Sequence, residues 1–83
     1  MTDIEPFEGF RALIADTFGA KPCEITRETT AADVNGWDSV SHASLIMAVE
    51  SAYGIQFPDA EIFEFNDVGA LFDRTMQLHE ATA

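Results

Sequence analysis

The sequence has 83 residues, of which 15 are acidic and 4 are basic, for a net charge of −11 at neutral pH. For a chain of this length we expect a single domain, residues 1–83, without a large enclosed active site. A negative charge this large repels nucleic acid and anionic lipid, so we expect no nucleic-acid or membrane partner and basic surfaces on protein partners. The 47% hydrophobic content, with 7 Phe residues, argues against disorder.

Cysteine content and the apolar stretches bear on the cellular setting. Cys23 is the only cysteine, which excludes an intramolecular disulfide and a zinc site built on cysteines. The first residues lack the basic segment and apolar run of a secretory signal, and the longest apolar stretch, 43–49, is too short to cross a membrane. We therefore expect a cytoplasmic protein.

The first helix is predicted from about Pro6 to Phe18. Proline suits a first helical position, and apolar residues repeat along one face at Phe10, Leu13, Ile14 and Phe18. Gly19 is expected to end this helix. From Gly19 to Asp38 there is no periodicity, only a Thr-rich patch and the turn signal Asn35-Gly36, which predict a long loop.

The second helix is predicted from Asp38-Ser39 to about Tyr53, with Gly54 at its end. It has two apolar stripes. The inward stripe consists of Leu45, Ile46, Val49 and Tyr53, and the second stripe consists of Val40, Ala43 and Met47. Both cannot face the same core, so the second stripe is either exposed as a docking surface or covered by the long loop.

The last third of the chain predicts a short helical turn and a final helix. The turn begins at Pro58-Asp59 and contains Ile62 and Phe63. Asn66-Asp67 caps the final helix, whose buried face consists of Val68, Leu71, Phe72 and Met76. The tail from His79 is expected to fray. With no alternating strand pattern, the predicted fold is an all-α bundle of three main helices and one short helix.

The segment Gly36-Trp37-Asp38-Ser39-Val40 gives the most specific functional signal. It places a serine hydroxyl at the start of an apolar helix, where backbone N–H groups and the helix dipole favour a phosphate. Ser39 could also be an ordinary N-cap, and Asp38 could serve in the same role. Trp37 is interpreted as a loop residue that covers the core.

This segment and its surroundings resemble the acyl carrier protein family, whose attachment motif is usually Asp-Ser-Leu followed by an amphipathic helix. The resemblance extends through residues 44–50, Tyr53-Gly54-Ile55, Phe57-Pro58-Asp59 and the closing helix. It implies that a phosphopantetheinyl transferase moves 4′-phosphopantetheine from coenzyme A onto Ser39. The arm's thiol then holds an acyl or aminoacyl group as a thioester.

A carrier of this kind has no catalytic activity of its own. The resemblance implies a loading ligase and downstream transferases or synthases as further partners, and we expect a monomer. It also implies partner-recognition roles for Asp38 and Val40. We expect Ala43 and Met47 of the second stripe, and the acids Glu61 and Glu64, to take part in the same recognition.

Two departures from the family pattern bear on the pathway. Val40 replaces the more usual Leu, and Glu50 is the only carboxylate of the second helix, whereas carriers of bacterial fatty-acid synthesis have several there. These departures favour a specialised biosynthetic pathway or an aminoacyl carrier. The acids around the short helix, Asp59, Glu61 and Glu64, are then expected to provide electrostatic recognition together with Asp38.

Parts of the sequence suggest three other functions. His42 lies three positions after Ser39 and suggests a Ser–His hydrolase, but no oxyanion glycine motif accompanies it. The segment 33–36 suggests a calcium loop, but its glycine comes too early and Ser44 stands where a bidentate Glu is needed, so no metal site is predicted. The main alternative is an unmodified acidic helical module that binds a basic protein.

Overall fold

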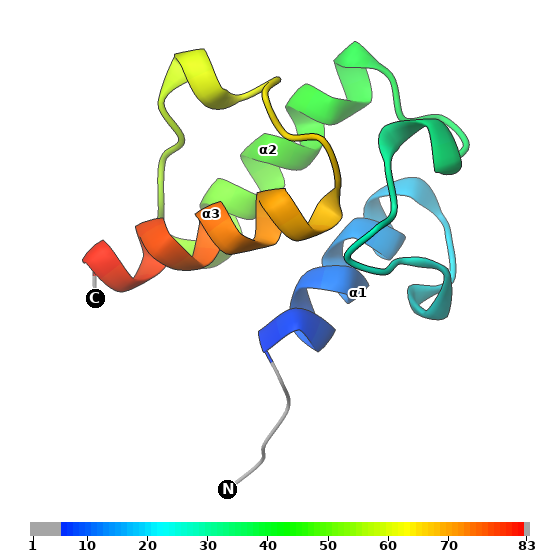
Figure 1. Cartoon of the computed structure of the whole chain (residues 1–83), viewed down its shortest axis with the longest axis horizontal. Helices are drawn as coiled ribbons and strands as arrows, with labels where there is room; N and C mark the ends of the chain where they lie inside the picture. The colour runs from blue at the N-terminus through cyan, green and yellow to red at the C-terminus, as the bar shows by residue number, and fades with distance from the viewer. Residues whose placement is uncertain (1–5, 83) are drawn as a thin grey trace, which may run out of the picture.

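The computed structural model describes the backbone of residues 6–82 and the side chains of residues 6–81. This part of the chain forms three α-helices and three short 3₁₀ turns without any strand (Figure 1). The helices are α1 (Pro6–Phe18), α2 (Ser39–Tyr53) and α3 (Val68–Thr82), and the turns are η1 (Pro22–Glu24), η2 (Ala31–Asp33) and η3 (Asp59–Glu61). The predicted all-α class is confirmed. None of the described helices is long and apolar enough to cross a membrane.

Glycines in the left-handed region end the first two helices, as predicted. Gly19 has φ of 67°, and the next N–H, from Ala20, donates to the carbonyl of Ala15 over 2.8 Å. Gly54 ends α2 with φ of 65° and donates to the carbonyl of Glu50. An L side chain adopts this backbone conformation only with strain, so glycine defines both ends.

The core lies where the three helices meet. The predicted inward stripe of α2 is confirmed, because Leu45, Ile46 and Val49 are at most 2% exposed and Tyr53 is half-buried. Helices α1 and α3 and the loops complete the core with Phe10, Ile14, Ala15, Ile25, Ile55, Phe57, Val68 and Leu71. Three faces of different helices thus share one apolar interior, which is what drives a chain this small to fold.

The long loop between α1 and α2 is more ordered than the sequence predicts, since it contains η1 and η2. Its segment 26–30 lies against the start of α3, where the N–H groups of Val68 and Gly69 donate to the carbonyls of Thr29 and Arg27, each over 2.8 Å. The first N–H groups of a helix have no partner within the helix. The loop therefore supplies acceptors that α3 lacks.

The prediction that the tail frays from His79 is wrong for the described residues, because α3 continues to Thr82. Nδ1 of His79 lies 3.0 Å from the carbonyl oxygen of Tyr53, so a contact to the end of α2 holds this turn in place. Asp67 caps the helix as predicted, with Oδ1 accepting from the N–H of Ala70 over 2.9 Å. Ala83 lies outside the described residues.

Candidate functional site

The first turn of α2 is closed by Asp38 and Ser41. Oδ1 of Asp38 accepts from the backbone N–H of Ser41 over 2.9 Å, and Oγ of Ser41 accepts from the backbone N–H of Asp38 over 2.8 Å. This reciprocal pair is a capping box. Of the two candidate N-caps, Asp38 is the one that is used, and the hydroxyl of Ser39 has no part in capping.

The same contacts set the charge next to Ser39. Hydrogen bonds from the backbone N–H and the hydroxyl of Ser41 hold the pKa of the Asp38 carboxyl below its usual range. Both donors favour the ionised form. A fixed negative charge therefore directly precedes the serine.

Ser39 is the first residue of α2, and its side chain is exposed. Its hydroxyl forms no hydrogen bond with any residue between 6 and 81. The backbone at this point is fixed by the capping box, so the hydroxyl is presented on a rigid helix start. The side chain is therefore open to modification without loss of a structural contact.

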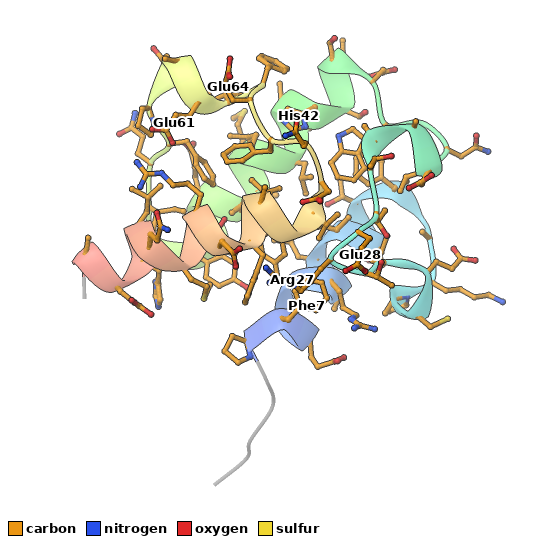
Figure 2. The ribbon with its side chains drawn as sticks, in the orientation of Figure 1. Phe7, Arg27, Glu28, His42, Glu61 and Glu64 are labelled. Carbon is orange, nitrogen blue, oxygen red and sulfur yellow. The ribbon has the colours of Figure 1, made fainter. Side chains whose placement is uncertain are left out.

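His42 links α2 to the segment that follows η3 (Figure 2). The indole N–H of Trp37 donates to Nδ1 of His42 over 2.9 Å, and Nε2 of His42 lies 2.6 Å from the carbonyl oxygen of Ile62. An indole nitrogen only donates, so Nδ1 accepts and Nε2 carries the proton that it donates to Ile62. Both ring nitrogens are occupied. His42 is therefore a structural link and not a base for Ser39, which argues against the hydrolase alternative.

Four rings lie next to one another from α1 to the segment after η3, the first three stacked and the last tilted, and we call them the aromatic row. The ring centroids of Phe18 and Trp37 are 4.8 Å apart, those of Trp37 and His42 6.0 Å, and those of His42 and Phe63 5.1 Å. Trp37 is half-buried, which confirms its predicted role as a cover for the core. Phe63, at the end of the row, is 65% exposed.

A half-open cavity of about 320 Å³ lies next to the aromatic row and includes Ser39 in its wall. Other parts of its wall come from the start of α3 and from the segment that joins η3 to α3. No group of three or more His, Cys, Asp or Glu side chains within the described residues is placed to hold a metal ion.

The comparisons with known proteins place this geometry in a family. Residues 8–74 match the family described as phosphopantetheine attachment site. The chain belongs to the acyl carrier protein family. It is 38% identical over 63 residues to an acyl carrier protein of Clostridium acetobutylicum, a match that covers 76% of this chain and 82% of that relative.

The fold matches that of a solved member of the family. The structure of a holo acyl carrier protein from Geobacter metallireducens, determined in solution by NMR, superposes with a TM-score of 0.83 at 29% identity. That match covers 95% of this chain and 91% of the other. Members of this family are carriers that hold 4′-phosphopantetheine covalently and have no catalytic activity of their own. When bound, the arm supplies a thiol that holds the cargo as a thioester.

The second apolar stripe of this carrier protein is exposed. Val40 is 78% exposed and Met47 is 69% exposed, and Ala43 between them is also exposed. The long loop therefore does not cover the stripe. Oε2 of Glu50, the only carboxylate of α2, accepts from the backbone N–H of Phe57 over 2.9 Å. The exposed residues of α2 are consequently uncharged, and the apolar stripe lies among exposed serines at positions 39, 44 and 51.

The two acids predicted to recognise partners at η3 differ in their surroundings (Figure 2). Glu61 binds the guanidinium of Arg74 through two hydrogen bonds of 2.7 and 3.2 Å. Glu64 is exposed and forms no ion pair with another described residue. The Glu61 carboxylate therefore has an internal partner, and Glu64 remains open to one from outside.

Three features of the site were not predicted from the sequence. Ser41 was not recognised as half of the cap, although the Asp38-x-x-Ser41 spacing is that of an N-cap and its N3 residue. The link from His42 to Ile62 had no sequence signal, because it depends on a carbonyl 20 positions along the chain. The exposure of Phe63 was also not foreseen, since a phenylalanine in a short turn usually packs inward.

Proposed function

We propose that Ser39 bears the 4′-phosphopantetheine arm and that the carrier delivers an acyl or aminoacyl thioester to enzymes of a specialised biosynthetic pathway. The observation that supports Ser39 is its exposed hydroxyl at the first residue of α2, with capping left to Asp38 and Ser41. Attachment would cost the fold no hydrogen bond. Oγ of Ser39 forms the new P–O bond, coenzyme A loses adenosine 3′,5′-bisphosphate, and the serine proton passes to the transferase.

The surface of α2 supports the choice of pathway. Carriers that meet basic patches on their partners need carboxylates along this helix, and here Glu50 is used internally while Val40 and Met47 are exposed. Contact with partner enzymes is then mainly apolar along α2. Asp38 at the start of α2 and Glu64 after η3 add exposed negative charge, which contributes to the rate of encounter more than to affinity.

The partners of this carrier are a phosphopantetheinyl transferase, a loading ligase, and downstream transferases or synthases. Residues 1–83 act as one domain, which works as a monomer in the cytoplasm. The net charge of −11 supports this, because it keeps copies of the chain apart in solution.

Intact mass measurement tests the attachment. Incubation of the apo protein with coenzyme A and a broad-specificity phosphopantetheinyl transferase should add about 340 Da. Ser39→Ala should remain unmodified. Ser44→Ala, which removes another exposed serine of α2, is the matched control and should be modified like the wild type. An unmodified wild-type chain with several competent transferases would favour the acidic interaction module instead.

A further inference from the structure

The ring of His42 lies between two hydrogen-bond partners that place opposite demands on its two nitrogens. The indole N–H of Trp37 lies 2.9 Å from Nδ1, and the carbonyl oxygen of Ile62 lies 2.6 Å from Nε2. An indole N–H only donates and a carbonyl oxygen only accepts, so Nδ1 keeps its lone pair and Nε2 carries the proton. Both bonds are therefore formed only by the neutral ring, in one tautomer.

A second proton on His42 is incompatible with the bond to Trp37. That proton would occupy Nδ1, and two N–H groups would then face each other across 2.9 Å. The bond to Ile62 would persist, because Nε2 remains a donor. We propose that His42 is a pH-sensitive latch, which holds Trp37 against α2 while its ring is neutral and releases Trp37 when its ring is protonated.

Two carboxylates are placed to receive the protonated ring. Asp38, at the start of α2, and Asp67, just before α3, line the same cavity as His42, and the other residues that line it are uncharged. Each carboxylate caps its helix through Oδ1, and its Oδ2 forms no hydrogen bond with another described residue. A charged ring that turns away from Trp37 therefore has a carboxylate in the same cavity to donate to.

The carboxylate of Asp38 is ionised in the range where the latch operates. Histidine gains its second ring proton between about pH 5 and 8. Hydrogen bonds from Ser41 hold the pKa of the Asp38 carboxyl below its usual range, so this carboxylate keeps its charge in mild acid. The anion that attracts the protonated ring of His42 is then present when that ring forms.

The remaining elements around His42 add further negative charge. On the side of the segment after η3, Ile62 is flanked by Glu61 and the exposed Glu64. The guanidinium of Arg74, from α3, is already bound to Glu61 through two hydrogen bonds. Helix α1 reaches the aromatic row through the uncharged ring of Phe18. The field at His42 therefore attracts a cationic ring and does not repel it.

Release of Trp37 affects the residues that lead into α2. Trp37 stands two positions before Ser39, and its ring lies 4.8 Å from that of Phe18 at the end of α1. With a neutral His42, the aromatic row joins α1, the start of α2 and the segment after η3. A protonated His42 breaks that row at Trp37 and leaves the turn before Ser39 less constrained. The latch consists of the chain's own residues, so it does not depend on the proposed attachment at Ser39.

The indole N–H signal of Trp37 tests the latch directly, because the chain has one tryptophan. Amide and indole ¹H–¹⁵N spectra are recorded from about pH 8 down to about pH 5, together with the ring signals of His42. We expect the indole signal to shift and its exchange with water to accelerate, with the midpoint at which the His42 ring is protonated. An indole signal that keeps its position and protection while that ring is protonated would overturn the proposal. A His42 ring that stays neutral until the protein unfolds would overturn it as well.

Two variants give the matched comparison. The glutamine of His42→Gln both donates and accepts but does not titrate, so its indole signal should stay constant over the same pH range. His79→Gln removes the other histidine and should keep the response of the wild type. A response of equal size in His42→Gln, or loss of the response in His79→Gln, would contradict the assignment of the latch to His42.

Thermal melting gives a second readout that does not need the indole signal. Melting temperatures are compared at about pH 7.5 and about pH 5.5, on either side of the usual histidine titration. The effect of the net charge of −11 is shared by all variants, and loss of the Trp37 bond should lower the wild-type melting temperature further in mild acid. Trp37→Phe keeps an aromatic ring without the N–H and should lack this additional loss. The same pH dependence in wild type and Trp37→Phe would overturn the proposal.

Discussion

Gly69 packs directly against the backbone of Arg27. Its N–H donates to the carbonyl oxygen of Arg27 over 2.8 Å, and a Cβ at position 69 would lie 3.0 Å from that oxygen and 3.1 Å from the Cβ of Arg27. Only glycine allows this approach without displacing one of the two segments. The contact holds the loop of residues 26–30 on the first turn of α3, next to the cavity.

Substitution of Gly69 by alanine should therefore destabilise the protein. In an open helical position the same change is favourable by about 1 kcal/mol. Here we expect a loss of about 1–3 kcal/mol, because the neighbouring atom is backbone and cannot swing away. Gly9→Ala in α1 is the matched control, since nothing lies within 4 Å of the added Cβ, and it should stabilise. Urea denaturation measures both, and a similar gain in both variants would show that the Arg27 contact is loose.

A charge on the exposed stripe of α2 should affect partners and not folding. Met47 is 69% exposed, so Met47→Glu should change the free energy of unfolding by no more than about 0.5 kcal/mol. It should slow modification or loading by a partner enzyme, because the contact there is apolar. Leu45→Ala, on the buried stripe, should instead cost about 2–5 kcal/mol. Met47→Glu with unchanged melting and unchanged rates would remove the stripe from the docking surface.

Substitutions of Glu61 and Glu64 should separate effects on stability from effects on partner recognition. Glu61→Gln weakens the ion pair with Arg74, which is about one third exposed, so we expect a stability loss of no more than about 1 kcal/mol. Glu64→Gln should leave stability unchanged and slow encounter with a basic partner, an effect that added salt reduces. Thermal melting and modification rates at two salt concentrations measure both. A stability loss confined to Glu64→Gln would contradict the structural role of Glu61 and the recognition role of Glu64.

Asp38 should make stability depend on pH in the acidic range. Its pKa is lowered in the folded state by the hydrogen bonds from Ser41, so the ionised carboxylate stabilises the fold above its unfolded-state pKa. That contribution is lost as the pH falls through the folded-state pKa. Asp38→Asn keeps a good N-cap without the charge, so it should melt lower than the wild type at neutral pH. The two melting curves should converge in acid, and a gap that stays constant with pH would refute this reading.

Local signals in the sequence predicted the helices well. Pro6, Gly19 and Gly54 mark helix boundaries because their backbone preferences act within one or two residues. The inward stripe of α2 followed from its spacing alone. By contrast, η1 and η2 were missed, because a turn of three residues has no periodicity to detect.

Features that depend on long-range contacts could not be predicted. The sequence identifies Glu61 as an acid but not that Arg74 lies beside it. The sequence suggested a frayed tail. The contact of His79 with the carbonyl of Tyr53, which holds the last turn, joins two helix ends far apart in the chain and leaves no local signal. The attachment serine was proposed from its motif, whereas the cavity next to it combines residues from four segments.

Fragmentation mass spectrometry of the holo protein tests the central claim most directly. The protein is modified with coenzyme A and a broad-specificity transferase, digested, and the position of the added mass of about 340 Da is read from the peptide that spans α2. We predict that all of the added mass lies on Ser39. Added mass on Ser41 or Ser44, or modification that persists in Ser39→Ala, would contradict the account.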